Sequence, residues 1–551
     1  MTTLDAPPAA AKRPGNLSLA HRGGIAALLI GVIHALYGLT PTAWEWTTMQ
    51  DIPYILRRLD PTFNPHDFYT NAVVDTPRFG VYWLTRCFAL FGVDWPGALY
   101  AVKVSTAIIR PALIFFVIAL AAERMADRTG NMAALPYTYA GALVFILAFI
   151  LWPVWWMPMG WVSAFVMEPV SASQIAATLG LGLTCMILHT PHRRLWLKAV
   201  LLAATTALHP AIGLALWAWT APVWLYASST WRAGALRAMT CLTPALGVAA
   251  ALAVTYAEPE TLSAEAFREI YVRWRHPFHY DLAYIFEFGR GQIISIVLLA
   301  GLWILSLRTQ RRDIILLTTG FVGVSVGAVA LHWIGVDVLA SKAAMKLGAT
   351  RFTSLAPVFV VMALAVVGVA LSAKSELFGA KGPKRSSTAA PAFAATAALL
   401  TAIIAPLSFQ PPLADTQSRD LVDWLSEHTE PSDVFIDMTL VPVANDRDGI
   451  HFHASDITQS VRVFAQRPVF ADKGYTFTER TSEAFRERLQ TNLALSRQPA
   501  ETLLCNTNGY RADYALYMAG HPMMPEQAAP VLKTHRWSLF DLKRDLPCPS
   551  P

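Results

Sequence analysis

The sequence predicts an α-helical, multi-pass membrane protein with a small α/β domain at its C-terminal end. Only 15% of the 551 residues are charged and 54% are hydrophobic, whereas soluble domains carry roughly 25% charged residues. Long apolar runs recur up to residue 408. After Phe409 the composition changes to that of a soluble domain. We therefore expect a membrane domain followed by a domain outside the bilayer.

The apolar runs set the number of membrane spans. One helix needs about 20 apolar residues to cross the hydrocarbon core, and this length predicts about eleven spans. They are 23–40, 104–122, 136–156, 171–189, 198–208, 210–226, 237–256, 291–308, 314–334, 350–372 and 391–408. The expected organisation is a disordered cytoplasmic tail (1–20), a membrane domain (21–408) whose first outer loop is 41–103, and an α/β domain (409–551).

Basic residues indicate the orientation of the chain. They mark every second loop, for example Arg124 and Arg128 after the second span and Arg311 and Arg312 after the eighth. Cytoplasmic loops carry this excess of Lys and Arg. We expect a protein of the inner (plasma) membrane with a cytoplasmic N-terminus and a periplasmic or extracellular C-terminal domain. The net charge of +6 then reflects topology, and no nucleic-acid partner is expected.

The C-terminal domain shows alternating helix and strand patterns. Residues 416–428 have helical apolar spacing, and 433–438, 513–518 and 537–542 have the pattern of buried strands. This alternation favours a small α/β domain. Cys505 and Cys548 lie in it and form either a disulfide, in an oxidising compartment, or two buried thiols.

The first outer loop gathers acidic and aromatic side chains between Pro41 and Arg78. Its segment TTMQDIPYILRRL predicts an amphipathic helix at the membrane interface, with Ile52, Ile55 and Leu56 toward lipid. This helix would hold Asp51 where an acceptor hydroxyl meets a lipid-linked donor. A carboxylate suits a general base, and Glu45 is the second candidate. In the alternative, Asp51 caps the helix or pairs with a neighbouring arginine.

Four further sites each allow a functional and a structural interpretation. Asp67 ligates a divalent cation (Mg²⁺ or Mn²⁺) or, as we favour, caps a helix. His209, where 198–208 meets 210–226 at His209-Pro210, contacts a phosphate or satisfies a freed carbonyl. That junction is a broken or re-entrant pair, or a tight turn at the membrane surface. Arg351 binds a phosphate or extends to the lipid headgroups. Arg275 and His276 bind an anionic headgroup or sugar, or belong to an interfacial belt.

Two histidines in the C-terminal domain, His451 and His453, alternate in HFHASD. They have no clear third partner in the sequence, and we assign no metal to them.

The overall pattern resembles the GT-C superfamily of integral-membrane glycosyltransferases, which use polyprenyl-phosphate-linked sugars. DLVDWLSEHTEPSDVFI is similar to the start of the soluble domain in many of them. VRVFAQRPVFADKGYTFTERTSEAFRERLQ is similar to a stretch of bacterial GT-C-like proteins of unassigned function, and DPTFNPHDFY resembles their first loop.

This resemblance implies a glycosyltransferase of the cell envelope. Its donor would be a polyprenyl-phosphate-linked sugar, its acceptor a glycan, lipid or protein, and its surroundings membrane lipids. Asp51 would be the base, with Glu45 or Asp67 in reserve, and Arg351 and His209 would hold the donor phosphate. The alternatives are a transporter of lipid or glycan, which predicts ionisable residues deep inside spans, and a non-catalytic assembly subunit.

Overall fold

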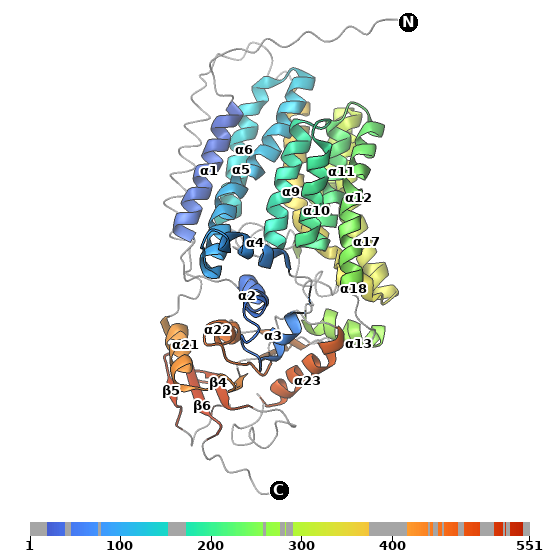
Figure 1. The fold of residues 1–551 in the computed structure, drawn as a ribbon. Coiled ribbons are helices and arrows are strands. Elements are labelled where there is room, and N and C mark those ends of the chain that lie inside the picture. Colours follow the sequence, from blue (N-terminus) through green and yellow to red (C-terminus); the bar gives the residue numbers. More distant parts are fainter. Residues whose placement is uncertain are drawn as a thin grey trace, which may run out of the picture.

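The computed structural model describes residues 19–38, 46–74, 76, 79–151, 172–256, 261–275, 282, 290–373, 416–438, 441–444, 450–453, 457–471, 479–495, 512–521, 524 and 529–543. These residues form a helical bundle and, at one end of it, a smaller part that contains all the described strands (Figure 1).

Among the described residues, ten long helices form the bundle. They are α1 (Leu19–Gly38), α5 (Trp95–Thr129), α6 (Leu135–Leu151), α9 (Ala172–His189), α10 (Leu195–Leu208), α11 (Pro210–Ala227), α12 (Trp231–Thr255), α16 (Arg290–Thr309), α17 (Arg312–His332) and α19 (Ala356–Ser372). Each overlaps one of the first ten predicted spans. Five described segments are long and apolar enough to cross a membrane: Gly97–Thr129, Ala172–His189, Trp231–Thr255, Arg312–Val338 and Lys342–Ser372. The number of about eleven spans therefore stays a prediction.

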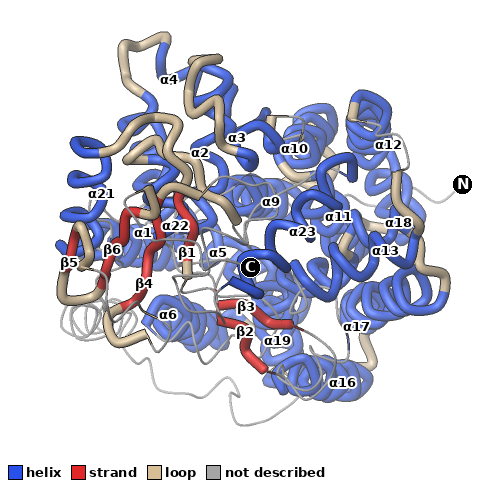
Figure 2. Tube along the Cα trace, turned by 90° about the horizontal axis from the view of Figure 1, so that it is seen from below, coloured by secondary structure: helices blue, strands red, loops and turns tan. Residues whose placement is uncertain are grey.

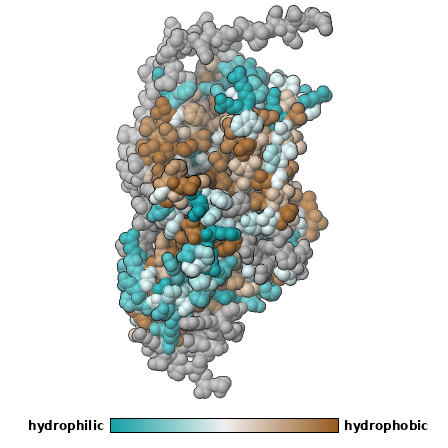
Figure 3. Space-filling view, viewed as in Figure 1, coloured by the Kyte–Doolittle hydropathy of each residue, from teal (hydrophilic) through white to brown (hydrophobic). Residues whose placement is uncertain are grey.

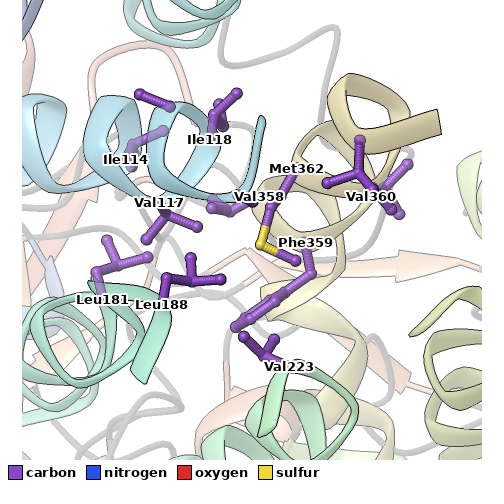
Figure 4. Packing of buried hydrophobic residues seen from close by; sticks show 14 of the residues in the cluster. Ile114, Val117, Ile118, Leu181, Leu188, Val223, Val358, Phe359, Val360 and Met362 are labelled. Carbon is purple, nitrogen blue, oxygen red and sulfur yellow. The ribbon is translucent and has the colours of Figure 1, made fainter. Parts of the chain in front are cut away.

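The bundle packs around α5 and α19. Of the residues in the most apolar part of Lys342–Ser372, 71% are buried inside the protein. The corresponding share for Trp231–Thr255 is 22%. Figure 4 shows Val117 of α5 beside Val358 of α19, while the Phe359 ring of α19 points toward Val223 of α11. Glycine permits the closest approach: a Cβ on Gly31 of α1 would meet the Ile108 carbonyl oxygen of α5 at 2.4 Å. Small residues at helix contacts are common in membrane proteins.

Basic side chains bind carbonyl groups at the end of the bundle away from the strands. The last carbonyls of a helix have no partner within the helix. Arg124 donates to the carbonyl of Leu188, at 2.9 Å, and to that of Ala227, at the ends of α9 and α11. Arg128 donates to the Tyr226 carbonyl and pairs with Asp313 of α17 at 2.5 Å.

Short elements between the long helices gather at the opposite end (Figure 1). They are α2 (Trp46–Leu59), α3 (Phe68–Val73) and α4 (Phe79–Ala89) after α1; α13 (Ala264–Arg268) and η3 (Glu269–Arg275) after α12; and η4 (Trp333–Val338), α18 (Lys342–Leu347) and η5 (Ala349–Leu355) after α17. A further short helix, η1 (Met132–Ala134), lies between α5 and α6. The turns after α9 and α16 lie at the other end of the bundle, and the orientation of the chain in the membrane stays a prediction.

The C-terminal part contains a four-stranded sheet of order β1-β4-β6-β5. Its strands are β1 (Phe435–Asp437), β4 (Tyr514–Met518), β5 (Leu532–Lys533) and β6 (Trp537–Asp541). β1 and β4 are parallel, with Ile436 opposite Ala515, and the other pairs are antiparallel. A separate antiparallel pair, β2 (Val441–Ala444) and β3 (Ile450–His453), stands apart from this sheet in Figure 2.

Helices cover both faces of the four-stranded sheet, which explains its continuous apolar strands. Alternate residues Tyr514 and Leu516 face α21 (Thr416–His428) and α22 (Ile457–Val463). Their neighbours Ala515 and Tyr517 face α23 (Glu479–Leu495). The sequence predicted α21 and the positions of β1, β4 and β6. Hydrophilic residues dominate the surface of this part and apolar ones that of the bundle (Figure 3).

Candidate active site

Helix α2, which carries Asp51, lies between the bundle and the C-terminal domain (Figure 1). Ile52 and Ile55 are fully buried, and they pack with Val81 of α4, Leu99 of α5 and Val463 of α22. The prediction that the apolar face of this helix meets lipid was therefore wrong. That face, with the partly buried Leu56, meets protein from both sides.

Asp51 lies in α2, one turn before Ile55. The structure describes its backbone but not its side chain, and Glu45 lies outside the described residues. The two neighbouring arginines bind backbone groups of the first loop. Arg57 donates to the Phe63 carbonyl at 3.0 Å, and Arg58 donates to the Val74 carbonyl at 3.1 Å. The role of Asp51 as a base stays a prediction.

Tyr54, one turn after Asp51, is a buried hydroxyl that the sequence reasoning did not select. Burial raises the pKa of Tyr54, while the guanidinium of Arg58 acts in the opposite direction. The Arg58 guanidinium lies 5.4 Å from the centre of the Tyr54 ring. The Tyr82 ring of α4 is edge-on to it at 6.5 Å. Burial is the larger of these effects, so the phenol of Tyr54 holds its proton more tightly than an exposed tyrosine does.

Asp67 is fully buried and caps α3, as we favoured from the sequence. Its Oδ2 accepts bonds from the Thr70 amide at 2.7 Å and the Thr70 hydroxyl at 2.8 Å. The same oxygen pairs with Arg462 Nε at 2.8 Å, and Oδ1 accepts from the Val469 amide at 3.0 Å. These contacts match the capping interpretation, and they use both carboxylate oxygens for protein groups.

His209 joins α10 and α11 in a tight helical hairpin. It is the N-cap of α11, where its Nδ1 accepts a bond from the Ile212 amide at 3.3 Å. Pro210 follows at the first helical position, where a missing N–H has no cost. The hairpin lies beside α4, since a Cβ on Gly80 would meet Leu208 Cδ2 at 2.6 Å. α4 in turn contacts α2 through Tyr82 and Tyr54, so α4 separates the His209 hairpin from the helix that carries Asp51.

Arg351 lies on η5, which packs between α11 and α17. It is half-buried. The next residue, Phe352, accepts a bond through its carbonyl from Trp219 Nε1 at 2.7 Å. Arg351 therefore belongs to a segment that packs against the helical bundle. Arg275 ends η3, which lies against β3 and α23. Its side chain and all of His276 lie outside what the structure describes.

Arg110 is a buried cation that the sequence reasoning missed. It is 2% exposed in the middle of α5. Its Nε donates to the Thr178 hydroxyl of α9 at 3.0 Å, and its guanidinium reaches the Gln174 carbonyl at 3.4 Å. An arginine followed by proline inside the predicted span 104–122 was visible in the sequence. Ionisable residues inside spans are rare and are often functional.

Within the described residues, no group of three or more His, Cys, Asp or Glu side chains is arranged to hold a metal ion. The strand positions of His451 and His453 are described, but their side chains are not. Cys505 and Cys548 fall outside the described part of the chain, so the disulfide stays a prediction. Cys87, Cys185 and Cys241 are free thiols.

No family model matches the sequence, and no curated protein matches it. Among solved structures, the chain is similar to the single-particle cryo-EM structure of the arabinofuranosyltransferase AftD from Mycobacteria. The identity is 15% and the TM-score 0.45, over 92% of this chain and 35% of that chain. The chain thus spans about a third of the length of that protein. A likeness of this degree assigns no residue and no activity to this chain.

Proposed function

We propose that this chain is a GT-C-like glycosyltransferase of the inner membrane. It moves a sugar from a polyprenyl-phosphate-linked donor to a glycan, lipid or protein acceptor at the membrane surface. The observation that carries the proposal is the placement of α2. This helix lies between the apolar bundle and the C-terminal domain, and we propose that a lipid-linked donor approaches it from the bundle and a water-soluble acceptor from the C-terminal domain.

In the proposed reaction, an acceptor hydroxyl attacks the anomeric carbon of the donor, and the polyprenyl phosphate leaves. Asp51 removes the proton of the hydroxyl as the new bond forms, with Glu45 as the alternative base. Arg351 and His209 hold the phosphate, whose charge a guanidinium binds well. Arg275 and His276, in the loop between the predicted spans 237–256 and 291–308, contact the sugar or headgroup, and the C-terminal domain helps to bind the acceptor.

The reaction is proposed to occur on the periplasmic or extracellular face. Arg124 and Arg128, near the C-terminal end of α5, lie at the end of the bundle opposite α2 and the C-terminal domain. Positively charged loops favour the cytoplasmic side.

Lipid analysis of cells that lack the gene tests this function. We expect a polyprenyl-phosphate monosaccharide to accumulate, and the wild-type protein but not Asp51→Asn to reverse the accumulation. Asp60→Asn is the matched control, because Asp60 is exposed in the same loop. Reversal by Asp51→Asn as well would discard Asp51 as the base. An unchanged lipid-linked sugar pool in the deletion strain would reject the transferase and favour a scaffold or transport role.

One observation favours a second candidate, a transporter of lipid or glycan. Arg110 is buried in the middle of α5, which is the placement expected of a residue on a transport path. Under this candidate, Arg110→Gln abolishes flipping of a fluorescent polyprenyl-phosphate lipid in reconstituted vesicles. Wild-type protein that does not move such a lipid would exclude this candidate.

A further inference from the structure

The ion pair between Asp67 and Arg462 joins two parts of the chain that are 395 residues apart. Both side chains are completely buried, and the Nε–Oδ2 distance is 2.8 Å. The Arg462 guanidinium also lies 4.9 Å from the centre of the Tyr69 ring. The first outer loop and the C-terminal domain thus meet through a charged contact that is shielded from water.

A second arginine reinforces this contact. Arg488 of α23 lies over the Phe68 ring of α3, at 4.7 Å, and donates to the Phe470 carbonyl at 3.0 Å. Tyr69 is edge-on to Phe485 of α23 at 6.2 Å. α3 is therefore held by cations and aromatic rings of the C-terminal domain.

A buried ion pair is a demanding way to join two surfaces. Removing two charges from water is costly, and only good geometry offsets the cost. A pair of this kind therefore favours one arrangement of its two elements over displaced ones. A contact that fixes the position of one element relative to another needs this preference for a single arrangement.

Helix α22 transmits this position to the candidate active site. Arg462 is on α22, and the next residue, Val463, packs with Ile52 and Ile55 of α2. We propose that the buried Asp67–Arg462 pair is a positioning device that seats α22 on α2 and so fixes the helix that carries Asp51. Arg462 and Asp67 are then positioning residues of the transfer reaction, an inference that rests on the proposed function for its catalytic consequence.

Hydrogen–deuterium exchange of the full-length protein in lipid nanodiscs tests the positioning directly. Arg462→Met leaves Asp67 buried without this partner, and we expect amide exchange in α2 to accelerate about tenfold. Exchange in α5 and α19 should remain at the wild-type rate. Arg486→Met is the matched control, since Arg486 forms an exposed pair with Glu483 in the same domain.

The double variant Asp67→Asn/Arg462→Met keeps the inference testable if the single variant does not fold. It removes both charges and retains one oxygen that can cap α3, while the Val469 amide loses its acceptor. We therefore expect α2 exchange to return part of the way toward the wild-type rate. Arg462→Lys, which keeps the charge, should lie between the wild type and Arg462→Met. Wild-type exchange of α2 in Arg462→Met would overturn the inference, as would a double variant no better than the single one.

The lipid-linked sugar pool, measured at equal protein levels, separates this inference from the proposed function. Donor accumulation in Arg462→Met that the double variant relieves links the position of α2 to transfer. Unchanged α2 exchange together with accumulation in Asp51→Asn would reject the positioning role alone. Accelerated α2 exchange with no lipid change even in the deletion strain would reject the transferase alone.

Discussion

Individual polar side chains in the interior of this protein join elements that are distant in sequence. Trp219 of α11 is completely buried, and its indole N–H binds the Phe352 carbonyl of η5. Its ring stacks on Phe359 of α19 with centroids 5.3 Å apart. Phe352 lies within the 3-10 helix η5, and the indole bond ties this carbonyl to α11. Trp219 therefore fixes the segment that carries Arg351.

Trp219→Phe is expected to destabilise the protein. The substitution keeps an aromatic ring but leaves the buried Phe352 carbonyl without its indole donor, which costs about 1–3 kcal/mol. Thermal unfolding of the detergent-solubilised protein should show a lower midpoint than the wild type. Trp231→Phe, at an exposed position, should leave the midpoint unchanged. Equal midpoints for the two variants would show that the bond to η5 contributes nothing measurable.

In the first outer loop, helix α4 has exposed apolar side chains, whereas the apolar face of α2 is buried against protein. Trp83 is 60% exposed, and Leu90 and Phe91, at its end, are 84% and 83% exposed. The opposite face of α4 is buried through Val81 and Thr85. A helix of this kind at the end of an apolar bundle is suited to the membrane interface.

We therefore expect the end of α4 to contact lipid. A nitroxide label in place of Phe91, in nanodiscs, should be more accessible to oxygen than to a water-soluble nickel chelate. A label in place of Asp60, in the exposed part of the same loop, should show the reverse. Preferential access of the nickel chelate to position 91 would contradict the assignment.

The sequence predicted the elements better than their surroundings. Helix 416–428 and the strands around residues 436, 515 and 539 follow from local apolar spacing, which the structure confirms. The sequence predicted the helix α2, but it did not predict that other parts of the protein cover its apolar face. Val463, one of the residues that pack on α2, is far along the chain, and no local sequence pattern signals such a contact.

The same distinction applies to the candidate site. Capping by Asp67 follows from the local sequence, because an N-cap binds amides within its own turn. Its partner Arg462 is 395 residues away, so only the fold reveals that pair. Arg110 differs, since a cation inside an apolar run is a local signal that the sequence reasoning overlooked.

At the scale of the whole molecule, the two ends of the bundle differ in chemistry. One end has Arg124, Arg128 and the exposed His192 and Arg193 in its turns, and the other has the long loops and the C-terminal domain. Lys and Arg accumulate on the cytoplasmic side of membrane proteins. We therefore expect the end with the basic residues to face the cytoplasm and the C-terminal domain to face the outside.

Single cysteines in a background with the five native cysteines replaced by alanine test that direction. A cysteine in place of Asp420, exposed on α21, should react with a membrane-impermeant maleimide in spheroplasts. A cysteine in place of His192, in the basic turn after α9, should react only after permeabilisation. Because both positions are exposed on the protein, a difference in labelling reports the membrane barrier rather than local burial. The reverse pattern would place the C-terminal domain and α2 in the cytoplasm, where the proposed transfer to an outer-face acceptor does not take place.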